Sequence, residues 1–150
     1  MSSPAAKKPR FGVKIPFVQH LGFELVLFEN GLSQIDYEPQ PDHFNSFNVA
    51  HGGAVMTLLD VTMATAARSG TPEMGVVTIE MKTSFMRPCK GKLSAKGRLV
   101  HRTPTLAFAE ALIYNTLGQA CAQSTGTFKY VKRLPVSPTG TQPLNVISTD

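Results

Sequence analysis

The chain has 150 residues and carries 15 basic and 10 acidic side chains, a net charge of +5. This length predicts one domain with a single core, and no apolar run reaches the roughly 18 residues of a membrane span. Cys89 and Cys121 are too few for a disulfide framework and lack metal-ligand spacing. A reduced, cytoplasmic protein is therefore expected. The N-terminus agrees with this expectation, because Lys14 and Pro16 make it a poor signal peptide.

The first part of the chain predicts a short helix and a β-hairpin. Residues 1–14 are basic and contain proline, so we expect disorder there; residues 15–133 form the expected domain, and residues 134–150 a loose tail. The stretch "IPFVQHLG" predicts a helix ending at Gly22. The strands "FELVLF" and "LSQIDYE" flank "ENG", which indicates a hairpin.

A long helix is predicted from Gly52 to Ala67, after a loop that contains Asn45 and Asn48. This segment is apolar on nearly every side. A helix of that kind must be enclosed.

Beyond the helix the hydrophobic period changes to two, which indicates strands. The stretch "VVTIEMKTSFMR" is expected to share one face through Val77, Ile79, Met81, Thr83 and Phe85, and "KLSAKGRLVH" through Leu93, Ala95, Leu99 and His101. A second hairpin joins "TLAFAEALIYN" to "QACAQSTGTFKYVKR" through "NTLG". The order of elements predicts an α+β fold, an antiparallel sheet curled around a central helix.

Asp60 is the one charge within the predicted helix. Its helical neighbours, such as Met56 and Met63, cannot neutralise a carboxylate, and burying an isolated charge costs free energy. A capping role fails because Asp60 lies about two turns inside the helix. A structural acid bonded to the sheet and a catalytic acid both remain open.

The helix begins at His51-Gly52-Gly53. A helix N-terminus presents unpaired N–H groups and a partial positive charge, and glycine lets a ligand approach them closely. Such a donor can polarise a carbonyl group and stabilise an oxyanion. Together with Asp60, this is a more specific signal than a tight turn alone.

The motif "HGGAVMTLLD", with Asn45 six residues before His51, resembles that of hotdog-fold acyl-CoA thioesterases, and most closely the phenylacetyl-CoA thioesterase-like branch. The similarity runs over Gly22 to Arg133 and includes "TIEMKTSFMRPCKG" and "TPTLAFAEALIYN". It implies hydrolysis of an acyl-CoA to a carboxylic acid and coenzyme A, with no metal or redox cofactor. It also implies active sites shared across a homodimer, often doubled into a tetramer.

The resemblance assigns roles to individual residues. Asp60 matches the catalytic carboxylate, which acts as nucleophile or general base; Gly52 matches the donor to the thioester carbonyl; and Asn45 matches a polar residue of the same site. His51, Gly53 and Thr78 match positions that line it. Where some relatives carry a threonine one turn after the acid, this chain has Ala64.

Charge is unevenly distributed along the chain. Ile15 to Glu80 holds eight acids and one base, whereas Met81 to Arg133 holds ten bases and one acid. These bases are either solvated strand faces or a surface for a polyanion. The resemblance favours the phosphates of coenzyme A, with Arg87, Lys90 and Arg102 as candidate ligands. Walls for the acyl group are predicted at Met56, Met63, Phe85 and Met86, although core packing is the alternative role for each.

Three rival functions remain less consistent with the sequence. A hotdog dehydratase would need Phe-Pro after its histidine, but His43 precedes Phe-Asn, and Thr57 stands where its acid belongs. A non-catalytic acyl-CoA-binding module would normally lack Asp60. A pI of about 9.4 suggests nucleic-acid binding, yet no recognition helix or aromatic-glycine motif is present. The acyl group stays open between aryl and medium-chain.

Overall fold

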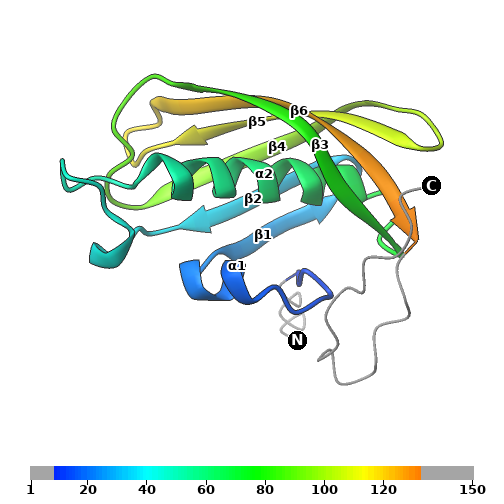
Figure 1. Cartoon of the computed structure of the whole chain (residues 1–150), viewed down its shortest axis with the longest axis horizontal. Helices are drawn as coiled ribbons and strands as arrows, with labels where there is room; N and C mark the ends of the chain where they lie inside the picture. Colours follow the sequence, from blue (N-terminus) through cyan, green and yellow to red (C-terminus); the bar gives the residue numbers. More distant parts are fainter. Residues whose placement is uncertain (1–8, 133–150) are drawn as a thin grey trace, which may run out of the picture.

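A six-stranded antiparallel sheet curves around one long helix in the computed structural model, which describes residues 9–132 (Figure 1). Its strands lie in the order β1-β2-β4-β5-β6-β3. The elements are α1 (Pro16–Leu21), β1 (Glu24–Glu29), β2 (Leu32–Tyr37), the 3-10 helix η1 (Pro41–His43), α2 (Gly52–Arg68), β3 (Met74–Phe85), β4 (Leu93–Arg102), β5 (Leu106–Tyr114) and β6 (Ala120–Lys132). This arrangement confirms the predicted hotdog architecture.

The described residues include the predicted domain, residues 15–133, except its last residue. The expected loose tail at residues 134–150 falls outside them, as do residues 1–8 of the expected basic segment. Within the remainder of that segment, Phe11 packs against the core, and its carbonyl accepts a hydrogen bond from Arg68. The domain boundaries stay a prediction.

Local turn chemistry forms the two predicted hairpins. Asn30 and Gly31 between β1 and β2 both have positive φ, 51° and 78°, the backbone that suits a two-residue hairpin turn. Gly118, with φ 74°, turns the chain between β5 and β6. Gly22, with φ 77°, ends α1 as predicted.

The sheet-facing side of α2 forms the centre of the core. Leu58, Leu59 and Met63 are completely buried. Gly97 of β4 allows this close packing, because a Cβ atom there would lie only 2.7 Å from a backbone oxygen of α2. Glycine is thus required where the helix crosses the sheet.

A β-bulge divides β3 into two segments. The register against β6 shifts between Thr78 and Glu80, so Thr78 and Met81 face α2 although they are three residues apart. The predicted single face is therefore wrong for Val77 and Ile79: Val77 alternates with the inward Thr78, and Ile79 is 54% exposed at the bulge. A bulge adds one residue and reverses the alternation beyond it.

A second bulge changes the end of β4. Its register against β5 shifts between Leu99 and His101, so the prediction that these two residues share a face is wrong. Leu99 packs against the core, whereas the His101 ring stacks on Phe108. Arg102 turns inward instead, with its guanidinium 4.2 Å from the centre of the Tyr130 ring.

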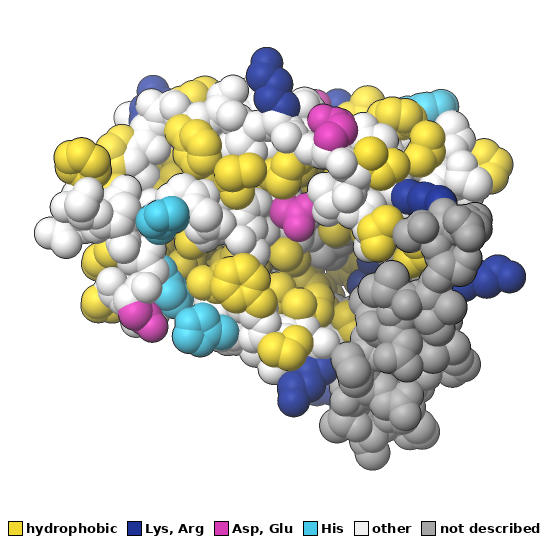
Figure 2. Space-filling view, viewed as in Figure 1, with side chains coloured by type: hydrophobic (Ala, Val, Ile, Leu, Met, Phe, Trp, Pro, Cys, Tyr) yellow, Lys and Arg dark blue, Asp and Glu magenta, His cyan; other side chains and the backbone are white. Residues whose placement is uncertain are grey.

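One side of α2 is not enclosed by the described residues of one chain, so a single chain meets the prediction of an enclosed helix only on the side that faces the sheet. Gly53 and Met56 are exposed there, while Thr57, Asp60 and Ala64 are half-buried. Figure 1 shows α2 in the concavity of the sheet with this side toward the viewer, and hydrophobic side chains gather on the same face in Figure 2. No helix within residues 9–132 is long and apolar enough to span a membrane.

Candidate active site

The first turn of α2 leaves one backbone donor available. His51 caps the helix: its Nδ1 accepts the Gly53 N–H at 2.8 Å, and its carbonyl accepts the N–H groups of Ala54 and Val55 at 2.9 and 3.1 Å. Within residues 9–132 the Gly52 N–H has no hydrogen-bond partner. The histidine therefore organises the helix end, and the positive end of the helix dipole is presented through Gly52.

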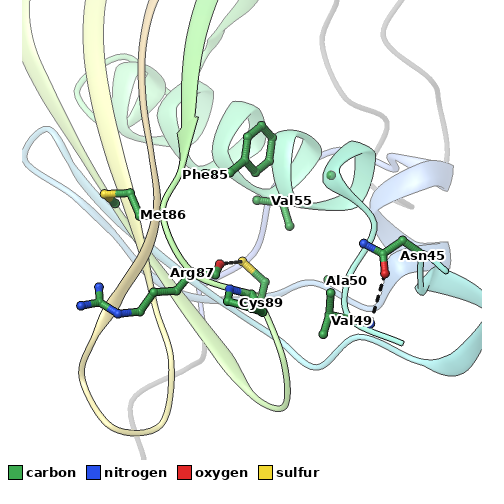
Figure 3. Close-up of a pocket in the computed structure, with 10 residues that line it drawn as sticks. Asn45, Val49, Ala50, Val55, Phe85, Met86, Arg87 and Cys89 are labelled. Carbon is green, nitrogen blue, oxygen red and sulfur yellow. Dashed lines mark hydrogen bonds between the residues drawn. The ribbon is translucent and has the colours of Figure 1, made fainter. Parts of the chain in front are cut away.

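Asn45 supplies a second donor beside this helix end. Its Oδ1 accepts the N–H groups of Phe47 at 2.9 Å and Val49 at 3.4 Å, which fixes the orientation of the side-chain amide. The Nδ2 group is thereby left to face outward from the turn, as Figure 3 shows. Asn45 can thus donate to a ligand but cannot accept from one through its occupied oxygen.

Both donors border a cavity of about 430 Å³ at the N-terminal end of α2 (Figure 3). The cavity is lined by Asn45, Val49, Ala50, Gly52, Val55, Phe85, Met86, Arg87, Pro88 and Cys89. The Phe85 ring lies over Gly52, 3.6 Å from where a Cβ would stand, and is 55% exposed. Two residues with free N–H donors thus line the same mostly apolar hollow, an arrangement suited to a carbonyl oxygen attached to an apolar group.

Asp60 has a partner on the sheet. The Thr78 hydroxyl donates a hydrogen bond of 2.6 Å to the Asp60 carboxylate. Burial raises the pKa of Asp60 above its ordinary value, and the Thr78 hydrogen bond partly offsets that rise because it favours the charged form. A half-buried carboxylate held in this way has the properties of a general base or a nucleophile.

Asp60 and Gly52 border different hollows. Asp60 and Thr78 line a hollow of about 190 Å³ together with Met56, Thr57 and Met81, and none of these residues lines the cavity at the helix N-terminus. The chain therefore brings Gly52 to Asn45, and Asp60 to Thr78. It does not bring these two pairs to one point.

The three candidate coenzyme A ligands lie at opposite ends of α2. Arg87 lines the N-terminal cavity, but its guanidinium donates to the Ala120 carbonyl at 2.7 Å and its side chain extends away from Asn45 (Figure 3). Lys90 is exposed shortly after Arg87. Arg102 lies beyond the other end of the helix, where it also contacts the Thr71 hydroxyl. One chain therefore cannot gather all three around one ligand group.

The predicted acyl walls divide in a similar way. Phe85 and Met86 line the first cavity and Met56 the second, whereas Met63 is completely buried in the core. Sequence reasoning missed Met81 and Cys89 as lining residues. The period-two pattern did place Met81 on the same face as Phe85, but no local signal identifies Cys89, which reaches the cavity from the loop after β3.

Comparisons with known proteins show which family the chain belongs to. The family model described as the thioesterase superfamily matches residues 47–122, a segment that contains the helix end, Asp60 and Thr78. The chain belongs to the thioesterase superfamily. It is accordingly a thioester hydrolase with the hotdog fold.

Individual relatives of this thioesterase are distant in sequence. A curated protein of Saccharolobus solfataricus, which carries the provisional name of an esterase, is 26% identical over 117 residues, 77% of this chain and 83% of the relative. A conserved protein of Pseudomonas aeruginosa has a solved structure with TM-score 0.77 and 25% identity, covering 85% of this chain and all of that one. A Streptococcus mutans protein, solved bound to acetyl CoA, has TM-score 0.69 and 27% identity over 74% of this chain and 90% of its own.

Proposed function

We propose that this thioesterase hydrolyses acyl-CoA thioesters to a carboxylic acid and free coenzyme A. The observation that carries the proposal is the unpaired Gly52 N–H beside the Asn45 amide at the mouth of an apolar cavity. The thioester oxygen accepts hydrogen bonds from both donors, which stabilise the negative charge that develops on it during attack. The sequence motif and the acetyl CoA bound to the Streptococcus mutans relative both support a coenzyme A thioester.

Asp60 provides the attacking group. Either its carboxylate takes a proton from water, which then attacks the thioester carbon, or it attacks that carbon directly and water hydrolyses the resulting anhydride. Both routes pass through a tetrahedral oxyanion, break the carbon–sulfur bond and release coenzyme A as a thiol after proton uptake. Thr78 orients the carboxylate in either route through its 2.6 Å hydrogen bond. No metal or redox cofactor takes part in this scheme.

The complete site is shared by two copies of the chain. Gly52 and Asp60 are eight residues apart on α2, so their backbones lie roughly 12 Å apart, whereas reacting atoms must come within about 3–3.5 Å. A two-fold axis places the glycine end of one helix opposite the acid of the partner. Two features support this arrangement: β3 is an edge strand of the described sheet, and one side of α2 is open. A dimer of dimers is the further assembly that the motif resemblance implies.

The two-chain site also suits the spread of the basic residues. Arg87 and Lys90 at one end of α2 and Arg102 of the partner at the other can approach the same coenzyme A across an antiparallel pair of helices. The phosphates of coenzyme A are the polyanion for which the basic second half of the chain provides countercharge. The apolar lining from Val49, Val55 and Phe85 suits an aryl or medium-chain acyl group.

A panel of purified acyl-CoA substrates, assayed by thiol release, tests this function. We expect turnover of at least one aryl- or medium-chain acyl-CoA, and we expect Asp60→Asn to lower it by about 10² or more with coenzyme A thioester binding retained. Glu80→Gln is the matched control, since this carboxylate accepts a hydrogen bond from Thr127 and faces away from α2. A folded Asp60→Asn variant with normal turnover would refute the assignment.

The alternative is a non-catalytic acyl-CoA-binding module. It predicts saturable acyl-CoA binding without thiol release across the whole panel, and equal binding by wild type and Asp60→Asn. The Thr78 hydrogen bond favours the enzyme, because it orients a half-buried carboxylate and partly offsets the rise in its pKa that burial causes.

A further inference from the structure

The loop that carries Asn45 is closed at its base by His43. The His43 carbonyl accepts the His51 N–H at 2.9 Å, an isolated bridge pairs Phe44 with Ala50, and the Asn45 N–H donates to the Val49 carbonyl at 2.8 Å. We call residues 43–51 the Asn45 loop. Because this loop ends where α2 begins, the position of its base determines where the Asn45 amide stands relative to the Gly52 N–H.

Hydrogen bonds to the imidazole ring hold His43 in place. The side chain is buried, and its Nδ1 accepts the Gln40 N–H at 3.1 Å and lies 2.8 Å from the Tyr37 hydroxyl. Burial, with a smaller contribution from Asp42, raises the pKa of Tyr37 to about 12, so the phenol keeps its proton and can donate as well. The backbone donor at Gln40 cannot act as an acceptor, and Nδ1 must therefore be unprotonated for this contact to exist.

The same cluster offers a metal-site interpretation that the hydrogen bonds argue against. Potential ligand atoms of His20, Asp42 and His43 lie within 4.8 Å of one another. With Nδ1 accepting, however, the proton of the neutral His43 ring is on Nε2, which removes the lone pair that a metal ion would need. The Nε2 atom lies 3.5 Å from an Asp42 carboxylate oxygen, a close approach that is not a hydrogen bond.

We propose that His43 is a positioning residue of the active site, whose unprotonated Nδ1 anchors the Asn45 loop and whose protonation releases it. This inference rests on the proposed function for its catalytic consequence. A proton on Nδ1 would face the Gln40 N–H, placing donor against donor at the base of the loop. The Tyr37 hydroxyl can rotate to accept instead, but the Gln40 N–H cannot.

Three groups face the His43 ring. The Asp42 carboxylate approaches Nε2, the His20 ring lies with its centre 5.8 Å away in an edge-on arrangement, and the Tyr37 hydroxyl contacts Nδ1. Of these, only the negatively charged Asp42 favours the protonated ring, and it is largely exposed to water. A proton on Nδ1 would therefore remove the acceptor that holds the base of the loop.

Two substitutions of His43 separate the effect of a hydrogen-bond acceptor at this position from the effect of its protonation. In His43→Asn the side-chain oxygen stands near the place of Nδ1 and accepts at every pH, whereas His43→Leu fills similar space without an acceptor. The resonances of the Gly52 N–H and the Asn45 side-chain amide report the geometry by nuclear magnetic resonance without any need for activity. His51 is present in both wild type and His43→Asn, so the difference between these two proteins isolates His43.

We expect the two resonances to change with pH in wild type by more than in His43→Asn. We also expect folded His43→Leu to lose about tenfold to a hundredfold in kcat/KM, mainly in kcat, the scale expected for a misplaced donor, with His43→Asn remaining near wild type. Equal pH responses in wild type and His43→Asn would overturn the inference, and this comparison stands even if His43→Leu does not fold. If the resonances depend on His43 but no acyl-CoA is hydrolysed, the anchoring stands and the proposed function fails.

Discussion

Activity should be recoverable from two inactive variants if the site is shared between chains. Gly52→Pro removes the proposed carbonyl donor, and Asp60→Ala removes the attacking group. Gly52 occupies the first position of α2, where proline is well tolerated. Its N–H bonds to no group among the described residues, and His51 before it has ψ 140°, which a following proline accepts. The proline variant should therefore fold.

The size of the recovery follows from counting sites. Each homodimer should be nearly inactive, because every site lacks one group. With equal amounts and random exchange, half of the dimers contain one chain of each kind, and each of these has one site with both wild-type groups and one with neither. Activity should thus rise to about a quarter of wild type if both sites of a dimer work independently.

The assay is thiol release from an acyl-CoA before and after the two variants are dissociated and reassociated together. Chains carrying different affinity tags show the extent of exchange, and circular dichroism verifies that each variant is folded. Mixing two preparations of the same variant is the control and should restore nothing. If exchanged heterodimers remain inactive, Gly52 and Asp60 do not meet across the dimer, and the shared-site proposal is wrong.

Three further predictions concern the acid, the ligand and the core. Since burial raises the pKa of Asp60 and the Thr78 hydrogen bond lowers it, Thr78→Val should move the acid limb of the kcat/KM profile to higher pH; an unmoved limb would contradict the pairing. Arg87→Ala with Lys90→Ala should raise KM for acyl-CoA and weaken its salt dependence, because exposed ion pairs are screened over about 8–10 Å, and steady-state kinetics at several salt concentrations measures this. Gly97→Ala should destabilise the fold by about 1–3 kcal/mol, visible as a lower Tm, because its Cβ would lie 2.7 Å from the backbone of α2; an unchanged Tm would mean that the helix can shift away.

The sequence by itself determined the elements whose signals are local. The long apolar run from Gly52 to Ala67 predicts α2, and the turn residues at Asn30-Gly31 and Gly118 predict both hairpins, because each depends on neighbouring residues only. Gly52 and Asp60 can also be recognised as candidate site residues from local sequence, since a helix start and a lone charge within an apolar segment do not require knowledge of the fold.

Only the tertiary structure decided how these residues are partnered. The bulges at Ile79 and beyond Leu99 arise from pairing with other strands, so a strict period of two could not reveal them. The first bulge lets both Thr78 and Met81 face α2, and Thr78 thereby reaches Asp60 across 18 positions of the chain. Burial of the His43 ring likewise depends on strand β2, which is why the sequence offered it only as a poor match to a dehydratase motif.

The open side of α2 shows the same distinction at the level of assembly. Hydrophobicity along the segment predicted a helix that must be covered, and the fold of one chain covers only the side that faces the sheet. Apolar patterning specifies that a surface is to be removed from water, but it does not specify whether the same chain or a second copy removes it. That choice depends on how far the sheet can curve around the helix, which is a property of the folded chain as a whole.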